Sequence, residues 1–248
     1  MTRMTTRTSV LVLRLAGPLQ SWGASARFTR RTTESAPTKS GVIGLLAAAA
    51  GIERDDDERL APLAALRFGV RIDQPGTRIR DFHKAMHPVT GKTMPLSERF
   101  YLADAVFVAA VEGDPALVSD LFTALRAPVH LPFLGRRSCP PSGPVELALR
   151  TGARLEEVLE DVPWQASDWY RRRHRDRLPD RLTVLREKFA EETDAAADVL
   201  RDQPLSFAAS HRRHAWRTVV TTHVPLPHAT PPHDPFEALS DHLEEESA

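Results

Sequence analysis

Two adjacent arginines in a proline-flanked loop are the first candidates for chemistry in this sequence. The stretch "FLGRRSCPP" places Arg136 and Arg137 between Gly135 and Ser138. A guanidinium group offers a rigid fork of donors and a flat stacking face, which suits contact with phosphates or base edges. Adjacent arginines are also common on ordinary surface loops, so the pattern leaves both interpretations open.

A second candidate is the start of a predicted helix in "PTKSGVIGLLAAAAGI". Either Thr38 or Ser40 can cap a helix that continues to Ala50, and Gly51 can end it. The free backbone N–H groups at such a start favour an anion, and Lys39 adds a positive charge beside them. The segment therefore outlines a phosphate site, with an ordinary capped helix as the alternative. The glycine-rich loop of a P-loop is absent.

Two histidine pairs, in "HKAMH" (83–87) and "HRRH" (211–214), have ligand-like spacing. The first lacks the glutamate of the zinc-protease motif and the second lacks a third ligand at a matching spacing, so we predict no metal site and no cofactor. His83, with Lys84 beside it and near Tyr101, could instead act as acid or base in metal-free RNA cleavage. An enzyme interpretation therefore stays open.

An aromatic segment and a basic segment each allow two interpretations. In "LAGPLQSWG" (15–23), Trp22 is either a core residue, the commoner case, or a platform on which a base stacks. The cluster "YRRRHRDR" (170–177) is either a nucleic-acid-binding strip or a solvated helix face. Its interspersed acids favour the solvated face.

Composition restricts the class of protein. Of the 248 residues, 42% are apolar and 27% are charged, and no apolar run approaches the ~18 residues that cross a bilayer. We therefore expect a soluble protein with no membrane partner. The run at 9–16 loosely imitates a signal peptide, but Arg14 interrupts it and a strand fits better. The single cysteine, Cys139, fits a reducing cytoplasm.

The formal net charge is zero, but the charges are unevenly distributed. Residues 1–50 carry seven bases and one acid, residues 51–150 carry thirteen of each, and residues 151–248 carry thirteen bases and nineteen acids. Such asymmetry indicates a basic working face, with an ordinary solvated surface as the alternative.

The elements that must position these residues alternate between strand and helix patterns. In chain order we expect a strand at 9–16, a helix at 38–50, a strand at 66–73, a loop or hairpin insertion at 74–99, a strand at 100–113, a helix after the cap at 114–115, and a strand at 145–150. This order is the split βαβ pattern of ferredoxin-like folds, including RNA-recognition folds.

The pattern is looser beyond residue 150. We expect an acidic helix-like stretch near 186–201, then a strand pair at 204–209 and 215–224, and a poorly ordered tail over 223–248. The predicted domains are thus an RNA-binding domain at 1–150, a smaller C-terminal region at 151–222, and the tail.

Six segments, taken together, resemble the Cas-five (Cas5) family of the RAMP superfamily, in the form found in the type I-E CRISPR Cascade surveillance complex. They run in order from about residue 9 to 150 and resume near 201–220: "LVLRLAGPLQSWG", "PTKSGVIGLLAAAAGIERDD", "RDFH", "FYLADAVFVA", "PFLGRRSCP" and "RDQPLSF". The resemblance implies an α+β fold, namely a modified ferredoxin-like (RRM-like) domain with a protruding thumb β-hairpin at about 76–99 and a smaller C-terminal region. Residues 155–200 and the tail match no motif of the family.

The same resemblance implies a set of RNA-binding residues. Those after the first strand would touch or support bases, those at the helix start would meet phosphate, the arginine loop would close another side, and the thumb would meet RNA with an apolar tip residue as a wedge. The full set is Gln20, Ser21, Trp22, Arg30, Arg31, Lys39, Ser40, Gly41, Arg80, His83, Met94, Leu96, Arg99, Arg136, Arg137 and Ser138.

The function implied by the resemblance is that of a noncatalytic subunit. It would bind the 5′ handle of the CRISPR RNA (crRNA) and cap the backbone assembly. Its partners would be the crRNA, Cas-seven backbone subunits, the large Cascade subunit and, through the assembled complex, target DNA. The alternatives are a metal-independent endoribonuclease that trims repeat RNA, as relatives in another subtype do, and a stand-alone RNA-binding regulator.

Overall fold

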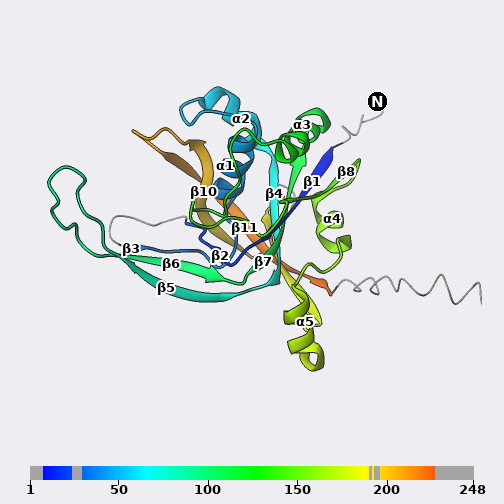
Figure 1. Cartoon of the computed structure of the whole chain (residues 1–248). Helices are drawn as coiled ribbons and strands as arrows, with labels where there is room; N and C mark the ends of the chain where they lie inside the picture. Colours follow the sequence, from blue (N-terminus) through cyan, green and yellow to red (C-terminus); the bar gives the residue numbers. More distant parts are fainter. Residues whose placement is uncertain (1–7, 24–29, 190–191, 193–195, 227–248) are drawn as a thin grey trace, which may run out of the picture.

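The computed structural model describes residues 8–23, 30–189, 192 and 196–226. Its main body is a seven-stranded sheet in the order β10-β11-β9-β4-β7-β1-β8, with every neighbouring pair antiparallel (Figure 1). The strands are β1 (Ser9–Ala16), β4 (Arg67–Gln74), β7 (Val106–Gly113), β8 (Glu146–Thr151), β9 (Arg181–Glu187), β10 (Ala197–Ser206) and β11 (Arg213–Pro225).

The central strands are apolar on both faces because both faces are covered. Successive side chains of a strand point to opposite faces. Leu11 and Leu13 of β1 accordingly join one buried cluster, while Val10 and Val12 join another. The first cluster lies under α1 (Lys39–Ala49), α2 (Asp57–Ala65) and α3 (Pro115–Arg126), and the second lies under α4 (Leu155–Asp161). The short helix α5 (Asp168–His174) and a 3₁₀ turn, η1 (Arg175–Arg177), follow α4 and project from the body (Figure 1).

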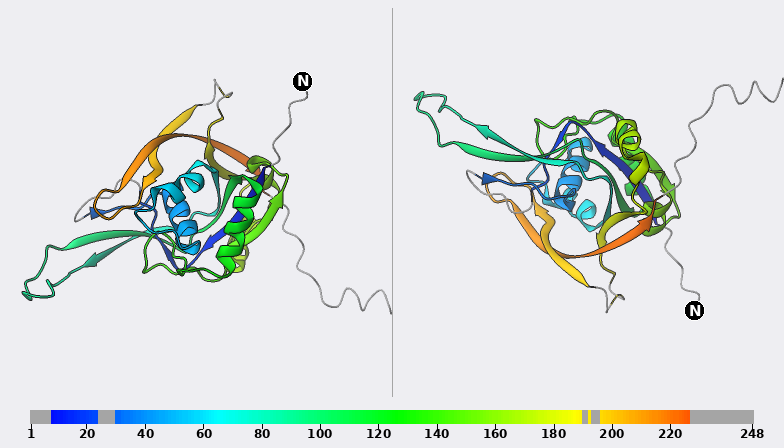
Figure 2. Two further views of the ribbon diagram at one scale, coloured as in Figure 1. Left: turned by 90° about the horizontal axis from the view of Figure 1, so that it is seen from above. Right: turned by 90° about the horizontal axis from the view of Figure 1, so that it is seen from below.

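A second, smaller sheet carries a long hairpin. It contains β2 (Leu19–Gln20), β3 (Arg30–Arg31), β5 (Thr77–His83) and β6 (Ser97–Ala103), with β6 paired to all three others. The β5–β6 pair forms the hairpin, which extends away from the body in every ribbon view (Figure 2). The segment 74–99, predicted as a loop or hairpin insertion, thus supplies most of an antiparallel hairpin.

Most of the predicted elements of residues 9–150 are present. The mixed helix and sheet class is confirmed, as are the strands at 9–16 and 66–73 and the two helices. Asp114 caps α3 through hydrogen bonds of 3.0 Å from two backbone N–H groups, with Pro115 at the first helical position. Thr38 rather than Ser40 is the N-cap of α1. Sequence analysis missed α2, whose cap is Asp56.

The single strand predicted at 100–113 was wrong. Asp104 has a φ of 56°, in the left-handed region, so the chain turns there. The residues before it form the end of β6 in the small sheet, and those from Val106 onward form β7 in the main sheet. One apolar run therefore serves two sheets.

The acidic helix-like stretch predicted near 186–201 was wrong for the residues that the structure describes there. Its first residues end β9 at Glu187 and its last residues begin β10 at Ala197, while 190–191 and 193–195 lie outside the described residues. Both β9 and β10 pair with β11, and this pairing imposes the extended conformation whatever the helix propensity of the residues. The predicted C-terminal strand pair is confirmed as β10 and β11, both longer than expected.

The C-terminal strands continue the main sheet. β9 pairs with β4, with Val70 opposite Leu185. Whether residues 1–150 fold as a separate unit stays a prediction. Of the predicted tail at 223–248, the first residues complete β11, and 227–248 lie outside the described residues. Within the described part of the chain, no helix is long and apolar enough to cross a membrane.

Candidate nucleic-acid interface

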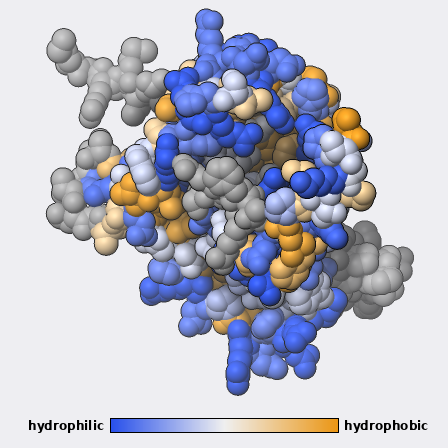
Figure 3. Space-filling view, turned by 90° about the vertical axis from the view of Figure 1, so that its left-hand side faces the viewer, coloured by the Kyte–Doolittle hydropathy of each residue, from blue (hydrophilic) through white to orange (hydrophobic). Residues whose placement is uncertain are grey.

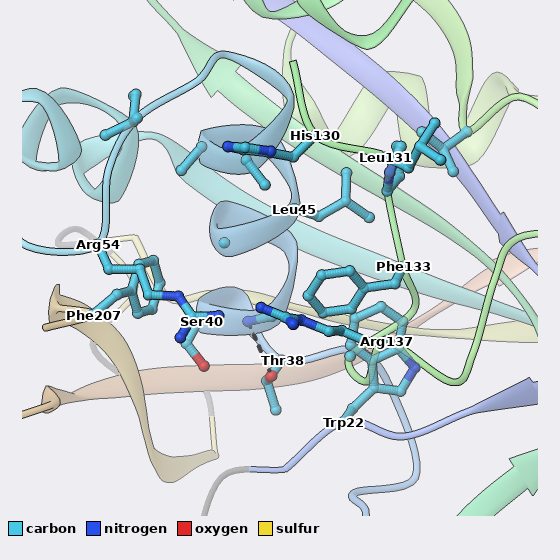
Figure 4. A pocket seen from close by; sticks show the side chains of 18 of the residues that line it. Trp22, Thr38, Ser40, Leu45, Arg54, His130, Leu131, Phe133, Arg137 and Phe207 are labelled. Carbon is cyan, nitrogen blue, oxygen red and sulfur yellow. Dashed lines mark hydrogen bonds between the residues drawn. The ribbon is translucent and has the colours of Figure 1, made fainter. Parts of the chain in front are cut away.

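A cleft of about 1350 Å³ lies over the side of α1 that carries Ser40, Gly41, Gly44 and Ala48. Five segments that are distant in the chain line it: residues 21–23, α1 with the turn at 52–55, the end of α3, the loop at 130–145, and the turn at 207–214 between β10 and β11. In Figure 4 the side chains of Arg54 and Arg137 point toward Ser40 from opposite sides of the cleft, with Phe207 and Phe133 beside them.

The start of α1 is closely packed against Trp22. The N–H of Gly41 donates to Thr38 Oγ1 at 3.3 Å, the capping bond drawn in Figure 4. A Cβ at Gly41 would lie 2.8 Å from the Trp22 ring, so this position admits only glycine without movement of the indole. Ser40, one residue earlier, is buried at the floor of the cleft.

The anion at this helix start belongs to the protein. The backbone N–H of Lys39 donates to Asp202 Oδ2 at 2.8 Å, and Arg217 donates to both oxygens of the same carboxylate at 2.6 and 2.9 Å. The Lys39 ammonium, 3% exposed, pairs with Glu187 at 2.7 Å. Burial lowers the pKa of Lys39 and the Glu187 carboxylate opposes that shift. The predicted role of Lys39 as a phosphate ligand is therefore corrected, because its charge is used inside the fold.

The residues after β1 also face inward. Gln20 Nε2 donates to the carbonyls of Leu15 at 3.0 Å and Ala105 at 2.8 Å, and its Oε1 accepts from Trp22 Nε1 at 3.0 Å. The Ser21 hydroxyl donates to the carbonyl of Phe100 at 3.1 Å. Gln20, Ser21 and Trp22 thus support the cleft from beneath. The core alternative for Trp22 is confirmed, since it has no exposed surface.

The two adjacent arginines have different roles. The Arg136 guanidinium lies 4.8 Å from the centre of the Tyr101 ring and donates to the carbonyl of Arg31 at 2.9 Å. Arg137 and Ser138 are exposed, and Arg137 lines the cleft. Arg136 therefore joins the loop to the small sheet, and Arg137 is available to a ligand.

Glycine at position 135 makes this arrangement possible. Its φ is +83°, a conformation that L side chains rarely adopt. A Cβ there would lie 1.8 Å from the carbonyl oxygen of Ser21, and the neighbouring Leu134 carbonyl accepts from the Ser21 N–H at 3.0 Å. The loop at 130–145 thus lies in direct backbone contact with Ser21, the residue after β2.

The hairpin places a second group of predicted residues away from the cleft. Arg80 lies 3.9 Å from Glu98 and 4.8 Å from the centre of the Phe82 ring. His83 pairs with Asp81, and Arg99 is partly buried on the opposite strand. In β3, Arg30 lies opposite Glu98 and Arg31 opposite Arg99, in a parallel register.

The hairpin also exposes an unusual amount of apolar surface. Met94 is 49% exposed and Leu96 is 54% exposed. The other large exposed apolar residues of the hairpin are Ile79, Phe82, Met86 and Val89. On the side of the molecule that carries the hairpin, apolar side chains gather in patches between hydrophilic ones (Figure 3). Such surface is typical of a contact with another molecule.

The residues that would carry out RNA cleavage, His83, Lys84 and Tyr101, do not lie together. In the β5–β6 register His83 lies opposite Ser97, whereas Tyr101 lies opposite Ile79, four pairs away. At ~3.4 Å per residue this separates them by about 14 Å. Tyr101 is buried beneath Arg136, so it is not placed to share a substrate atom with His83 or Lys84. Among the described residues no group of three potential ligands could hold a metal ion.

Sequence analysis missed several residues of the cleft. Arg54 and Phe207 lie in the quoted segments "IERDD" and "RDQPLSF", but nothing local indicates that these segments meet. Other missed lining residues include Arg126, His130, Phe133, Arg212 and His214. Burial lowers the pKa of His214, which favours the neutral imidazole.

Comparison with known proteins agrees with this architecture. Residues 10–220 match the family model described as "CRISPR-associated protein (Cas_Cas5)". The chain is 37% identical over 180 residues to the protein of Escherichia coli (strain K12) named "CRISPR system Cascade subunit CasD", a match that covers 65% of this chain and 80% of that protein.

Two solved structures are similar over nearly the whole chain. One, "Crystal structure of Cas protein", has 35% identity and a TM-score of 0.67, covering 90% of this chain and all of that one. The other, a chain of a "CRISPR RNA-guided surveillance complex", has 31% identity and a TM-score of 0.68, covering 95% and 99%. The family model spans far more than half of the residues, and the chain therefore belongs to the CRISPR-associated Cas5 family.

Proposed function

We propose that this protein is a noncatalytic subunit of a type I-E Cascade surveillance complex, and that its cleft binds the 5′ handle of the crRNA. The observation that carries the proposal is the composition of the cleft. Four arginines and two phenylalanines, from segments distant in the chain, line one concave surface: Arg54, Arg126, Arg137, Arg212, Phe133 and Phe207.

This composition suits single-stranded RNA. Such RNA is held by cations along its backbone and by flat side chains on which bases stack. Arg54 and Arg137 can meet phosphates, while Phe133 and Phe207 offer ring faces. The acidic residues Glu53, Asp55 and Glu146 also line the cleft, so a strand would follow its basic side. A zero net charge is compatible with this because the local groove determines the contact.

The hairpin is the second part of the proposal. We assign β5–β6 as the thumb of the family, on which Arg80 and His83 would meet RNA and Met94 or Leu96 would wedge between nucleotides. Four neighbouring strands of the main sheet lie in the order β4-β7-β1-β8. In the chain, α1 and α2 connect β1 to β4, and α3 lies between β7 and β8. This arrangement supports a modified ferredoxin-like body.

The partners follow from the relatives. A protein with 37% identity is named a Cascade subunit, and a chain with 31% identity lies in an RNA-guided surveillance complex. By analogy, this chain would cap the backbone of Cas-seven subunits, contact the large subunit and reach target DNA only through the assembly, in the cytoplasm. The endoribonuclease alternative is not favoured, because its residues lie apart.

Arg137→Ala tests the cleft. Purified protein, alone and co-expressed with its candidate neighbours, is titrated against labelled handle RNA in fluorescence anisotropy. Loss of one charged contact, worth about 1.4 kcal/mol, lowers the affinity about tenfold. Arg59→Ala, which removes an exposed charge from α2, is the matched control and leaves the affinity unchanged. Equal affinities of the Arg137→Ala variant and wild type would reject the cleft as the site.

A further inference from the structure

The arm formed by α5 and η1 is a basic surface that the proposed function does not use. Residues 168–177, which form the arm, hold five arginines and two aspartates, an excess of three positive charges. The segment 151–248 as a whole is acidic, with nineteen acids and thirteen bases. The positive charge is thus concentrated on one projection from an otherwise acidic region.

The arginines at the end of this arm face solvent without a counter-charge. Arg172, Arg173 and Arg177 are exposed, and within the described part of the chain no ion pair joins them to another residue. Arg175 lies 3.7 Å from Asp176, with both side chains more than four-fifths exposed. No residue of α5 or η1 is buried, so packing of the body does not account for this run of arginines.

The arm is nevertheless held in a fixed position. Arg171 lies over the Trp164 ring at 5.2 Å and donates to its carbonyl, and Tyr170 packs edge-on against the same ring at 6.4 Å. Trp164 is buried and donates to the carbonyl of Asp73 at 2.9 Å. At the start of α5, the Ser167 hydroxyl donates to Gln74 Oε1 at 2.8 Å. The exposed arginines are therefore presented from a rigid base at the end of β4.

The shape and position of the arm indicate which ligand it fits. It is a convex projection on a different side of the molecule from the hairpin and α1 (Figure 1). A single strand requires a groove with stacking platforms, which a convex helix does not provide. A helix about 10–12 Å wide with its side chains matches the ~12 Å major groove of B-form DNA, whereas the major groove of duplex RNA is too narrow.

We propose that the α5–η1 arm enters the major groove of double-stranded DNA and contacts the phosphates that border it, with Arg172, Arg173 and Arg177 as the contacting residues. The binding does not depend on sequence, because guanidinium contacts to phosphates carry no base information. This proposal does not depend on the cleft, so the test of DNA binding by the arm is separate from the test of RNA handle binding by the cleft.

The test compares Arg172→Ala/Arg173→Ala with Arg59→Ala/Arg150→Ala in the full-length protein. Both double variants remove two exposed charges, the second pair from α2 and β8. Anisotropy across a KCl series measures affinity for a DNA duplex of about two helical turns, for an RNA duplex, and for single-stranded RNA of the same length. Melting temperatures verify that both variants fold.

The first double variant should bind the DNA duplex roughly 10- to 50-fold more weakly at moderate salt and lower the salt slope by about 2, since each phosphate contact contributes about 0.9. The control should bind as wild type does. An unchanged affinity and slope, or a wild-type chain that does not bind the DNA duplex, would overturn the proposal. A loss confined to single-stranded RNA, or equal for all three probes, would overturn the assignment to duplex DNA.

Discussion

The carboxylate of Asp202 on β10 accepts a hydrogen bond from the backbone N–H of Lys39 in the first turn of α1, across 163 positions of sequence. Unsatisfied N–H groups at a helix start carry partial positive charge, which an anion stabilises. Arg217 pairs with the same carboxylate, and neither Asp202 nor Lys39 is more than 3% exposed. An internal anion thus joins the helix to the C-terminal part of the sheet.

Removing this charge should destabilise the protein strongly. Asp202→Asn leaves Arg217, whose side chain is 9% exposed, without its counter-charge, and breaking a buried pair in this way costs about 3–5 kcal/mol. Urea denaturation measures the loss. The control is Asp57→Asn, whose partner Arg213 is half exposed and which should cost less than about 1 kcal/mol. Equal losses in the two variants would contradict the role of Asp202.

The adjacent arginines should separate stability from binding. Arg136→Ala removes a contact with the Tyr101 ring and a bond to the Arg31 carbonyl, and should lower the free energy of unfolding by about 2 kcal/mol. Arg137→Ala should leave stability within about 0.5 kcal/mol of wild type, as exposed substitutions do. Thermal unfolding of the two variants measures both losses of stability. The reverse order would show that the two assignments are exchanged.

Gly135→Ala should damage the cleft without removing any side chain. The new Cβ meets the Ser21 carbonyl and the backbone has a positive φ, so the substitution should cost more than about 1–2 kcal/mol and weaken RNA binding. Gly143→Ala in the same loop is the control, because a Cβ there meets nothing within 4 Å. Calorimetry and RNA titration together test this. A Gly135→Ala variant as stable as Gly143→Ala would be inconsistent with the close approach.

The loss of folding stability at acid pH should depend on Glu192. Hydrogen bonds from Arg186, one of 2.8 Å, lower the pKa of Glu192 from 4.5 to about 2, and the Phe189 N–H adds to the shift. Because the folded pKa is lower, the unfolded chain binds more protons in this range. The contribution is complete above pH 4.5 and is lost as the pH falls toward 2. Glu192→Gln should reduce the dependence of the free energy of unfolding on pH in this range, as measured by urea denaturation at several pH values. An unchanged pH dependence would show that the Arg186–Glu192 pair does not contribute to it.

The exposed apolar residues of the hairpin should contribute to binding rather than to folding. Met94→Ser/Leu96→Ser should leave the melting temperature unchanged and weaken RNA binding by the assembled complex at least tenfold, since burying one such side chain is worth about 1.5 kcal/mol or more. Val199→Ser, at a residue 58% exposed on β10, is the control. Wild-type RNA binding by the double variant would exclude the wedge.

Local signals predicted the local elements well. The Asp114–Pro115 cap of α3 and the alternation of β1 each depend on neighbours in sequence, and both are present. The break at Asp104 was missed because the apolar run continues across it, and only the pairing of β6 and β7 with different sheets reveals the turn.

The contacts that decide the site could not be predicted in the same way. Lys39 beside a helix start has the pattern of an anion ligand, and its partner Glu187 lies 148 positions later. Likewise, Arg54 and Phe207 line one cleft because β10 lies beside α1, which is a property of the tertiary fold. Motif recognition placed the segments in a family, but only the fold distinguishes Arg136, used internally, from Arg137.

The cleft draws on both ends of the chain, from Ser21 to His214, which has a consequence for biosynthesis. A ribosome must produce nearly the whole polypeptide before the turn after β10 can close the wall opposite Arg137. Incomplete translation products therefore have no finished cleft, and under the proposed function they lack the surface assigned to the guide RNA.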